Sequence, residues 1–340
     1  MGESYYLIRE ARKEDAKSIV PLAALLDRLS LPVEEEALAD ELVRSEASFG
    51  GSIRALGEER YILVMEEKPA GKIIGTSSLI AQHGTKAVPH VSLIVFAEER
   101  VSAVLRKTMV HACLQLKVDR DGPTAISSLV LLPEYRSNPL KLGKQLSLAR
   151  FAFLKMHRER FRDRLLAKLM PVNAGGAAPV FWEAFGKRFT GLDYAEAARL
   201  SLVDDEFVLS LFPKDRVYAS LLPPEAQQAI GATSSLVEQK ILEKIGFRYS
   251  HEVSPFDGAP YYTAVTDEVT VVRLTDRYGC QEAPIEAETS YLVAVHEKRK
   301  FRAIACPGKV QADRIVVPPG TIEKLELGRV ESVWALPLTG

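Results

Sequence analysis

The sequence predicts an α+β protein with two or three subdomains, and three observations support this prediction. The chain has 340 residues, which is more than one hydrophobic core usually holds. Runs of β-branched and aromatic residues alternate with segments of helical apolar spacing as far as about residue 275. From residue 276 onward there are only short apolar runs between turns, broken by Pro307-Gly308 and Pro319-Gly320.

The first part of the chain is expected to contain a strand, two helices and a hairpin. In the first helix Ile19, Leu22 and Leu26 recur at helical spacing after an acidic first turn. The second helix also begins with acidic residues, which complement the positive end of the helix dipole. Residues 68–70, Lys-Pro-Ala, separate two apolar runs and indicate a hairpin. The strand covers 4–11, the helices 12–29 and 32–48, and the hairpin strands 60–67 and 71–82.

The remaining elements follow the same signals, although the second half is less repetitive. A strand is expected over 91–97, and residues 103–116 fit either a helix or a bulged strand. A buried strand over 125–132 stops at Pro133, and an amphipathic helix is expected over 143–161. Further strands are expected over 163–172, 290–297, 300–306, 313–318 and 330–338, helices over 178–189, 204–213 and 223–231, and a helix followed by a strand over 235–249.

Composition excludes several classes of function. The 44 basic and 45 acidic residues give a formal net charge of −1, which indicates neither a nucleic-acid partner nor an anionic membrane surface. The three cysteines are far apart and odd in number, so we expect reduced thiols and a cytoplasmic location. The N-terminus lacks the apolar region of a secretory signal, and no apolar run approaches the ~18 residues of a membrane span. The histidines show no metal-ligand spacing, so no metal is expected.

A basic loop separates the buried strand from the long helix. It contains Arg136, Lys141, Gly143 and Lys144. The order of strand, two helices, hairpin, strand, basic loop and helix resembles that of the GNAT acyltransferases, in which this loop binds the pyrophosphate of coenzyme A. Free N–H groups and the dipole at a helix N-terminus form an anion site, and a glycine there lets the backbone approach closely. The spacing of Arg136 and a single glycine fits the GNAT pattern only in part, so a solvated basic turn is an equally good interpretation.

The whole chain is similar to the arginine N-succinyltransferase family. The most telling blocks are "APVFWEAFGKRFTGLDYAEA", "FVLSLFPKDRVYASLLPPEAQQAIG" and "LEKIGFRYSHEVSPFDGAP", and several blocks keep a dozen or more positions in register. The resemblance implies tandem GNAT-like acyl-CoA N-acyltransferase units over 1–160 and 161–275 and a small β-rich subdomain over 276–340. It also implies transfer of succinyl from succinyl-CoA to the α-amine of arginine, or of ornithine in some members, in arginine breakdown. Homo-oligomers, or hetero-oligomers with a related chain, are expected.

The resemblance also assigns residues to the acyl-CoA site. The family binds succinyl-CoA through a leucine of the central strand, and this position is Leu129. The backbone edge at Leu129, Val130 and Leu131 is therefore expected to contact the pantetheine and the thioester, although Leu129 also fits as a core residue. Arg136, Gly143 and Lys144 complete the expected cofactor-binding set.

The catalytic and amine-binding residues are less well matched. The family's proposed proton donor is a histidine in a Gly-Gln-Val-His stretch, where this chain has Ser234. A serine hydroxyl cannot titrate near neutral pH as imidazole does, but it could orient a water molecule. His251 is a possible substitute, and an exposed strand histidine is the alternative interpretation. Asp257 is a candidate partner of a substrate guanidinium, and an aspartate that caps a turn beside Gly258 is the alternative.

Three functional hypotheses remain open. The first is an arginine N-succinyltransferase in which a neutral amine attacks the thioester directly. The second is a GNAT-type transferase that uses another amine or acetyl-CoA. The third is a catalytically degenerate protein that binds acyl-CoA or serves as an assembly subunit. A proton-accepting group near the thioester would favour the enzymes, whereas a blocked pantetheine channel would favour the third hypothesis.

Overall fold

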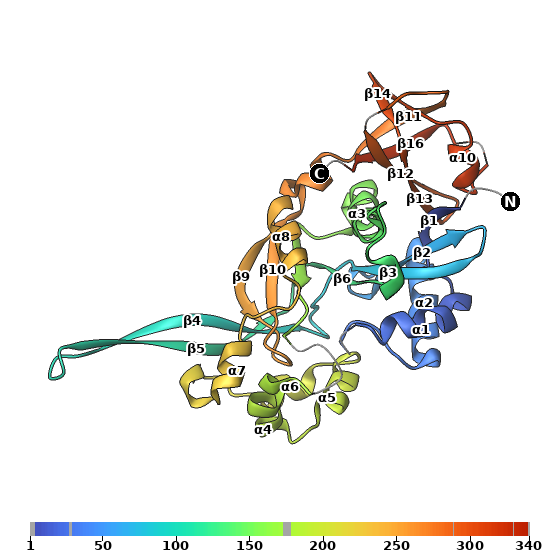
Figure 1. Ribbon diagram of the computed structural model, residues 1–340. Helices are drawn as coiled ribbons and strands as arrows, with labels where there is room; N and C mark the ends of the chain where they lie inside the picture. Colours follow the sequence, from blue (N-terminus) through green and yellow to red (C-terminus); the bar gives the residue numbers. More distant parts are fainter. Residues whose placement is uncertain (1–3, 27–28, 173–177, 288, 329, 339–340) are drawn as a thin grey trace.

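The computed structural model describes residues 4–26, 29–172, 178–287, 289–328 and 330–338 and contains one 16-stranded sheet. Strands from all parts of the chain contribute to this sheet (Figure 1). Its order is β14-β15-β11-β16-β12-β13-β1-β2-β3-β6-β7-β10-β9-β4-β5-β8. Neighbouring strands are antiparallel except for the pairs β6–β7 and β11–β15.

The N-terminal strands form an antiparallel group with helices on both faces. These strands are β1 (Tyr5–Glu10), β2 (Arg60–Lys68) and β3 (Lys72–Ile80). The helices α1 (Ala16–Ala23) and α2 (Glu35–Phe49) pack on the face that includes Ile62 and Val64. The opposite face, with Leu63 and Met65, packs against α3 (Leu142–Met156). Because successive side chains of a strand point to opposite faces, the apolar residues of β2 are divided between two hydrophobic cores.

The central feature of the sheet is the pair of β6 (Thr124–Leu131) and β7 (Arg164–Lys168). They pair in parallel from Thr124 with Leu165 to Ile126 with Ala167, and the pairing stops there. On its other side β6 pairs with β3, and the register shifts between Thr76 and Ser78, where Ser128 adopts a positive φ of 54°. A bulge bends a strand, so β6 and β7 separate beyond Ile126.

A long hairpin lies beyond the central strands. Its strands β4 (His90–Ser102) and β5 (Lys107–Asp119) pair without a register shift over their whole length and extend away from the body of the molecule (Figure 1). β4 also pairs with β9 (Arg248–Val253), which pairs with β10 (Pro260–Val265). The base of the hairpin packs in a core with Trp182 and Phe256. The other elements of this region are α4 (Lys187–Thr190), α5 (Tyr194–Ser201), α6 (Glu206–Leu211), β8 (Val217–Tyr218), α7 (Pro224–Ala229), α8 (Leu236–Ile245) and α9 (Thr270–Arg273).

The C-terminal region is rich in β-structure, as the turn pattern predicts. It joins the rest of the sheet through β13, which pairs with β1 at Ala303 and Ile8. Its core includes Val293, Ile304 and Val333. Its elements are β11 (Asp276–Glu282), β12 (Ser290–Glu297), β13 (Lys300–Pro307), β14 (Lys309–Gln311), β15 (Arg314–Val317), α10 (Thr321–Lys324) and β16 (Ser332–Pro337).

Most predicted elements are found, and residues 103–116 prove to belong to a hairpin strand and its turn. Residues 27 and 28 of the first predicted helix lie outside the described residues. Strands β10 and β11 and helix α5 were not expected from the sequence. The division between residues 160 and 161 stays a prediction, and strands from both sides of it pair in one sheet. Within the described part of the chain, no helix is long and apolar enough to cross a membrane.

Candidate active site

Two adjoining cavities lie where β6 and β7 separate. The outer cavity has a volume of about 420 Å³ and the inner cavity about 180 Å³. Both are lined by Leu26, Leu129, Met170 and Glu238, so these residues mark their junction. The outer cavity is further lined by Leu25, Val130, Leu131, Arg136, Gly143, Ser234 and Ser235. The outer cavity is the more open of the two, and we call the adjoining pair the channel and the inner cavity the chamber.

The outer cavity contains five of the six residues that were expected to bind the acyl-CoA. Leu129, Val130 and Leu131 contribute the edge of β6, Arg136 follows the short 3-10 helix Pro133–Tyr135, and Gly143 lies in the first turn of α3. The Nε atom of Arg136 donates a hydrogen bond to the carbonyl oxygen of Leu131 at 3.1 Å, which holds the guanidinium at the end of the strand. The basic loop is therefore brought beside the strand edge.

The N-terminus of α3 has the properties of an anion site. Lys141 precedes the helix with a positive φ of 53°, and no side chain caps the first turn. A Cβ atom added at Gly143 would meet only Leu131 Cδ1, at 3.5 Å, so the fold itself does not require glycine there. The absent side chain instead leaves space in the outer cavity for a ligand to approach the backbone.

Lys144 does not line either cavity. Its Nζ atom donates a hydrogen bond to the carbonyl oxygen of Leu338 at 3.0 Å and so links α3 to the C-terminal region. Burial, together with the charges of Lys141 and Lys244, lowers the pKa of Lys144. The cofactor-binding role expected for Lys144 stays a prediction, and this contact gives the side chain a structural role.

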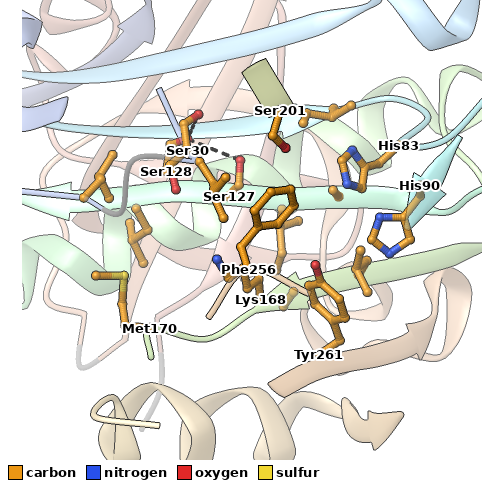
Figure 2. A pocket seen from close by; sticks show the side chains of 18 of the residues that line it. Ser30, His83, His90, Ser127, Ser128, Lys168, Met170, Ser201, Phe256 and Tyr261 are labelled. Carbon is orange, nitrogen blue, oxygen red and sulfur yellow. Dashed lines mark hydrogen bonds between the residues drawn. The ribbon is translucent and has the colours of Figure 1, made fainter. Parts of the chain in front are cut away.

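Ser30, Ser127 and Ser128 line one side of the inner cavity (Figure 2), and Ser78 on β3 lies behind them. The hydroxyl groups of Ser78 and Ser127 lie 2.8 Å apart, and the Ser78 hydroxyl donates to Ser128 Oγ at 3.0 Å. The Ser128 hydroxyl also donates to the carbonyl oxygen of Ser30 at 3.4 Å. This network fixes the bulge of β6 and places small polar groups directly before Leu129.

A buried arginine faces the same cavity. Arg150 lies on α3, is 3% exposed and lines the inner cavity. Its guanidinium donates to the carbonyl oxygen of Ser127 at 3.2 Å and to the carbonyl oxygen and hydroxyl of Ser147 at 3.2 and 2.8 Å. Burial is the largest cause that lowers the pKa of Arg150, to about 10, and the charge of Glu238 opposes this shift.

Two carboxylates line the cavity as well. Asp205 has a buried Oδ1 atom with no hydrogen-bond partner, and burial raises its pKa to about 7. Its contact with Ser201 lowers that pKa, and the nearby charge of Asp204 raises it. Burial also raises the pKa of Glu238, against the opposing effects of Arg150 and Ser235. A buried carboxylate oxygen that has no hydrogen-bond partner and faces a cavity is a strong candidate to bind a cation or to accept a proton.

Two histidines and a tyrosine form the side of the cavity opposite the serines in Figure 2. The rings of His83 and His90 lie 4.6 Å apart, and those of His90 and Tyr261 lie 5.3 Å apart. Burial lowers the pKa of His90 to about 4, so this ring is neutral at pH 7. Its Nε2 atom is buried and has no hydrogen-bond partner in the described structure. Neutral imidazoles add polar groups to the chamber without adding charge.

Asp257 is placed behind the chamber rather than in it. One carboxylate oxygen accepts from Lys168 Nζ at 2.6 Å, and the other accepts from the backbone N–H of Ala259 at 3.0 Å. The carboxylate side chain is fully buried, and Lys168 lines the inner cavity. Asp257 therefore holds the turn and neutralises Lys168, as in the alternative interpretation. Its direct contact with a substrate stays a prediction.

The two expected catalytic residues differ in position. Ser234 lines the outer cavity, and its hydroxyl donates to the carbonyl oxygen of Pro171 at 2.9 Å. His251 lies on β9 with an exposed side chain and a positive φ of 58°, and its ring contacts Tyr249 at 4.9 Å. It lines neither cavity. The structure therefore brings Ser234, and not His251, to the channel, while a catalytic role for each stays a prediction.

Several residues of the chamber were missed in the sequence. The sequence did contain a signal for Arg150, because this charged residue stands in a helix segment whose other residues are mostly apolar and buried, among them Leu146, Ala149, Phe151 and Phe153. A charged residue on the buried face of a helix needs a partner or a function. Asp205 had no such signal, since "DDEF" reads as an ordinary acidic helix start.

Comparison with known proteins relates this chain to one family. A family model described as "Arginine N-succinyltransferase beta subunit" matches residues 6–271. The arginine N-succinyltransferase of Yersinia enterocolitica is 30% identical over 305 residues, which is 87% of each chain. The arginine N-succinyltransferase subunit beta of Pseudomonas aeruginosa is 28% identical over 339 residues, which is 98% of each chain.

A solved structure has the same fold. The arginine/ornithine succinyltransferase subunit AI from Pseudomonas aeruginosa matches with a TM-score of 0.86 and 24% identity, over 99% of this chain and 100% of that chain. The match confirms the predicted α+β fold. The order of β1, two helices, the β2–β3 hairpin, β6 and α3 agrees with the GNAT-like layout expected from the sequence.

Proposed function

The chain belongs to the arginine N-succinyltransferase family of N-acyltransferases, and on this premise we propose that it transfers succinyl from succinyl-CoA to the α-amine of arginine. The observation that carries the proposal is the channel along β6, which runs from an uncapped helix N-terminus to a chamber with buried charges of both signs. Such a channel suits a long phosphorylated thioester at one end and a charged amino acid at the other.

The outer cavity is the proposed coenzyme A site. Its pyrophosphate would accept hydrogen bonds from the first N–H groups of α3 near Gly143, with Arg136 close by. The pantetheine would follow the edge of β6, which is free of β7 beyond Ile126. The thioester would then lie near Leu129, at the junction of the two cavities. A backbone N–H directed at its carbonyl oxygen would stabilise the tetrahedral oxyanion.

The inner cavity is the proposed site of the amino acid. Its α-ammonium must lose a proton before the nitrogen attacks the thioester carbon. Glu238 lies at the junction of the cavities, and its raised pKa suits a proton acceptor there. Asp205 lies in the inner cavity with an unpartnered oxygen, which suits the cationic end of the substrate side chain. Ser234 lines the outer cavity, and its hydroxyl would orient a water molecule that protonates the departing thiolate.

The proposal is tested by release of free coenzyme A from the purified protein. Succinyl-CoA and acetyl-CoA are each offered with arginine, ornithine and lysine. Turnover with succinyl-CoA and arginine is the expected result. Turnover with another pair alone would identify a transferase of different specificity. Absence of turnover with every pair, while acyl-CoA still raises the melting temperature, would replace the proposal with an acyl-CoA-binding role.

We also propose that the protein assembles with a second copy or with a related chain. Names of relatives refer to subunits, and the β4–β5 hairpin carries exposed apolar residues near its tip, with Val104 94% and Leu105 74% exposed. An exposed hairpin of this kind is a suitable contact surface. Light scattering of the purified chain would distinguish a monomer from an assembly. A cytoplasmic location stays a prediction.

A further inference from the structure

Arg150 is a buried cation in the chamber whose charge is not neutralised by an ion pair. Among the described residues, the guanidinium of Arg150 forms no ion pair, and its hydrogen bonds go to neutral oxygens of Ser127 and Ser147. The negative charge of Glu238 acts on Arg150 from a longer distance and raises its pKa. A buried charge without a close counter-ion carries a large desolvation cost, and a ligand of opposite charge can offset this cost.

The other cation of the chamber does not share this property. Lys168 also lines the inner cavity, but it forms a 2.6 Å ion pair with the buried Asp257. This difference in pairing is important because Arg150 and Lys168 line the same inner cavity of about 180 Å³. An anion that enters the chamber therefore finds one positive group already paired and one held by neutral oxygens. The guanidinium also has the planar fork that carboxylates match with two hydrogen bonds.

The position of Arg150 along β6 matches the length of a particular acyl group. Its guanidinium is anchored to the carbonyl oxygen of Ser127, two residues before Leu129. Two residues of a regular strand cover about 7 Å, and the bulge at Ser128 makes this an upper value for the step from Ser127 to Leu129. The four carbons of a succinyl group span about 4 Å between carbonyl and carboxylate carbons, and the hydrogen bonds to a guanidinium add about 3 Å. With the thioester near Leu129, a terminal carboxylate on such a chain would reach Arg150, whereas an acetyl group would not.

From this geometry, and resting on the proposed function, we infer that Arg150 binds the terminal carboxylate of the acyl group and so selects a dicarboxylic acyl-CoA. The reaction places a second carboxylate in the channel, the α-carboxylate of the amino acid. Both have the same chemistry, and Arg150 suits either. We assign it to the acyl group because the side chain is anchored to the strand along which the acyl chain runs.

The test compares Arg150→Met with the wild-type protein on two thioesters that differ only in the terminal carboxylate. With arginine as acceptor, the variant is expected to lower kcat/KM for succinyl-CoA by about 100-fold, as loss of a buried charge partner does. For butyryl-CoA the value is expected to change by less than about 3-fold. Equal losses with both thioesters would show a structural role and overturn the assignment. Arg150→Lys keeps the charge and should recover part of the preference.

A second arm distinguishes the two carboxylates. Arginine amide keeps the α-amine but lacks the α-carboxylate, so the ratio of kcat/KM for arginine over arginine amide reports on that group. The ratio is expected to be the same in Arg150→Met and in the wild-type protein. A ratio that falls only in the variant would assign Arg150 to the amino acid and overturn the inference. Arg273→Met is the matched control, because Arg273 is exposed on α9 and lines neither cavity.

Binding measurements separate this inference from the proposed function. Calorimetric titration of the wild-type protein should give about 100-fold tighter binding of succinyl-CoA than of butyryl-CoA, and Arg150→Met should bind both alike. This result would support Arg150 even if no acceptor were acylated, in which case only the proposed function would fail. Equal wild-type affinity for the two thioesters would overturn the inference. Retained binding of free coenzyme A and an unchanged circular dichroism spectrum would show that the variant is folded.

Discussion

The two ends of the channel use one helix, α3, in two different ways. At the outer end the helix offers an uncapped N-terminus beside Gly143 and the exposed Arg136. At the inner end it offers Arg150, which is 3% exposed and held by neutral oxygens. Both features attract anions. The first does so in contact with water, and the second in a desolvated chamber.

This difference in solvation sets the expected size of every effect. Charges in water are weakened by the high dielectric constant and by salt, so a single exposed cation contributes little. Buried charges interact strongly, and an unpaired one is costly to keep. We therefore expect substitutions in the inner cavity to have larger effects than substitutions of comparable groups in the outer cavity. The predictions below test this order, starting with the largest effect.

Asp205→Asn is expected to have a larger effect on activity than any substitution in the outer cavity. The change removes the negative charge that we assign to the substrate cation and keeps the size of the side chain. We expect kcat/KM for arginine to fall by about 100-fold, mainly through KM. Steady-state kinetics at fixed succinyl-CoA checks this. If the KM for arginine were unchanged, Asp205 would not bind the substrate, and the contrast between the two ends of the channel would weaken.

The same variant should change stability with a defined dependence on pH. The pKa of Asp205 is raised to about 7 in the folded protein, above its ordinary value of 3.8. The folded state therefore holds a proton that the unfolded state has lost, and stability falls as pH rises from about 4 to about 7. Without substrates, Asp205→Asn should melt at a higher temperature than the wild-type protein at pH 8, and the difference should shrink toward pH 5. A difference independent of pH would contradict the assignment.

Gly143→Val should have the next largest effect. Because an added Cβ meets only Leu131 Cδ1 at 3.5 Å, the protein should remain folded, while the side chain occupies the space in front of the helix N-terminus. We expect KM for succinyl-CoA to rise by roughly 10- to 100-fold. Gly143→Ala is the graded control, with a smaller rise. Unaltered KM values in both variants would show that the pyrophosphate binds elsewhere.

Arg136→Gln should have a smaller effect that depends on salt. The exposed guanidinium is expected to contribute about 3-fold to affinity for acyl-CoA at low ionic strength. The difference between variant and wild-type protein should nearly disappear at about 0.5 M salt, because screening shortens the range of the interaction. Titration of succinyl-CoA at two salt concentrations checks this. A loss of affinity as large as that of Arg150→Met would remove the distinction between exposed and buried anion sites.

The smallest effects test the two residues predicted to act in catalysis. Ser234→Ala is expected to lower kcat by about 5-fold, since a hydroxyl that orients a water is only one part of the proton pathway. His251→Gln is expected to change kcat by less than 2-fold, because this exposed side chain lines neither cavity. The pair serves as an internal comparison. A large effect of His251→Gln would show that β9 moves into the channel during the reaction.

Much of the outer site could be predicted from the sequence. Pro133 ends the central strand, and Gly143 begins a long amphipathic helix, so the loop with Arg136 had to lie beside the strand edge. These signals are local, because the residues that end a strand or a helix and the apolar spacing of a helix involve only a few neighbouring positions. Lys144 shows their limit. It shares the loop's basic character, but its Nζ atom contacts Leu338 in a region nearly two hundred positions later.

The inner site could not be predicted in the same way. Arg150 and Asp205 lie on α3 and at the start of α6, and the acidic Glu238 lies on α8. Nothing in their local sequence relates one to another. Asp257 illustrates the same point, because its match to a family block did not reveal that Lys168 occupies its carboxylate.

By itself, the sequence determined the α+β character of the chain, most of its elements, its similarity to one family and the basic loop before α3. Only the tertiary structure decided which charged groups are buried together in the chamber and which of them keep an unpaired atom. The physical reason is that periodicity and turn chemistry depend on neighbours in the chain. Desolvation and ion pairing depend on neighbours in space, which here come from segments on both sides of residue 160.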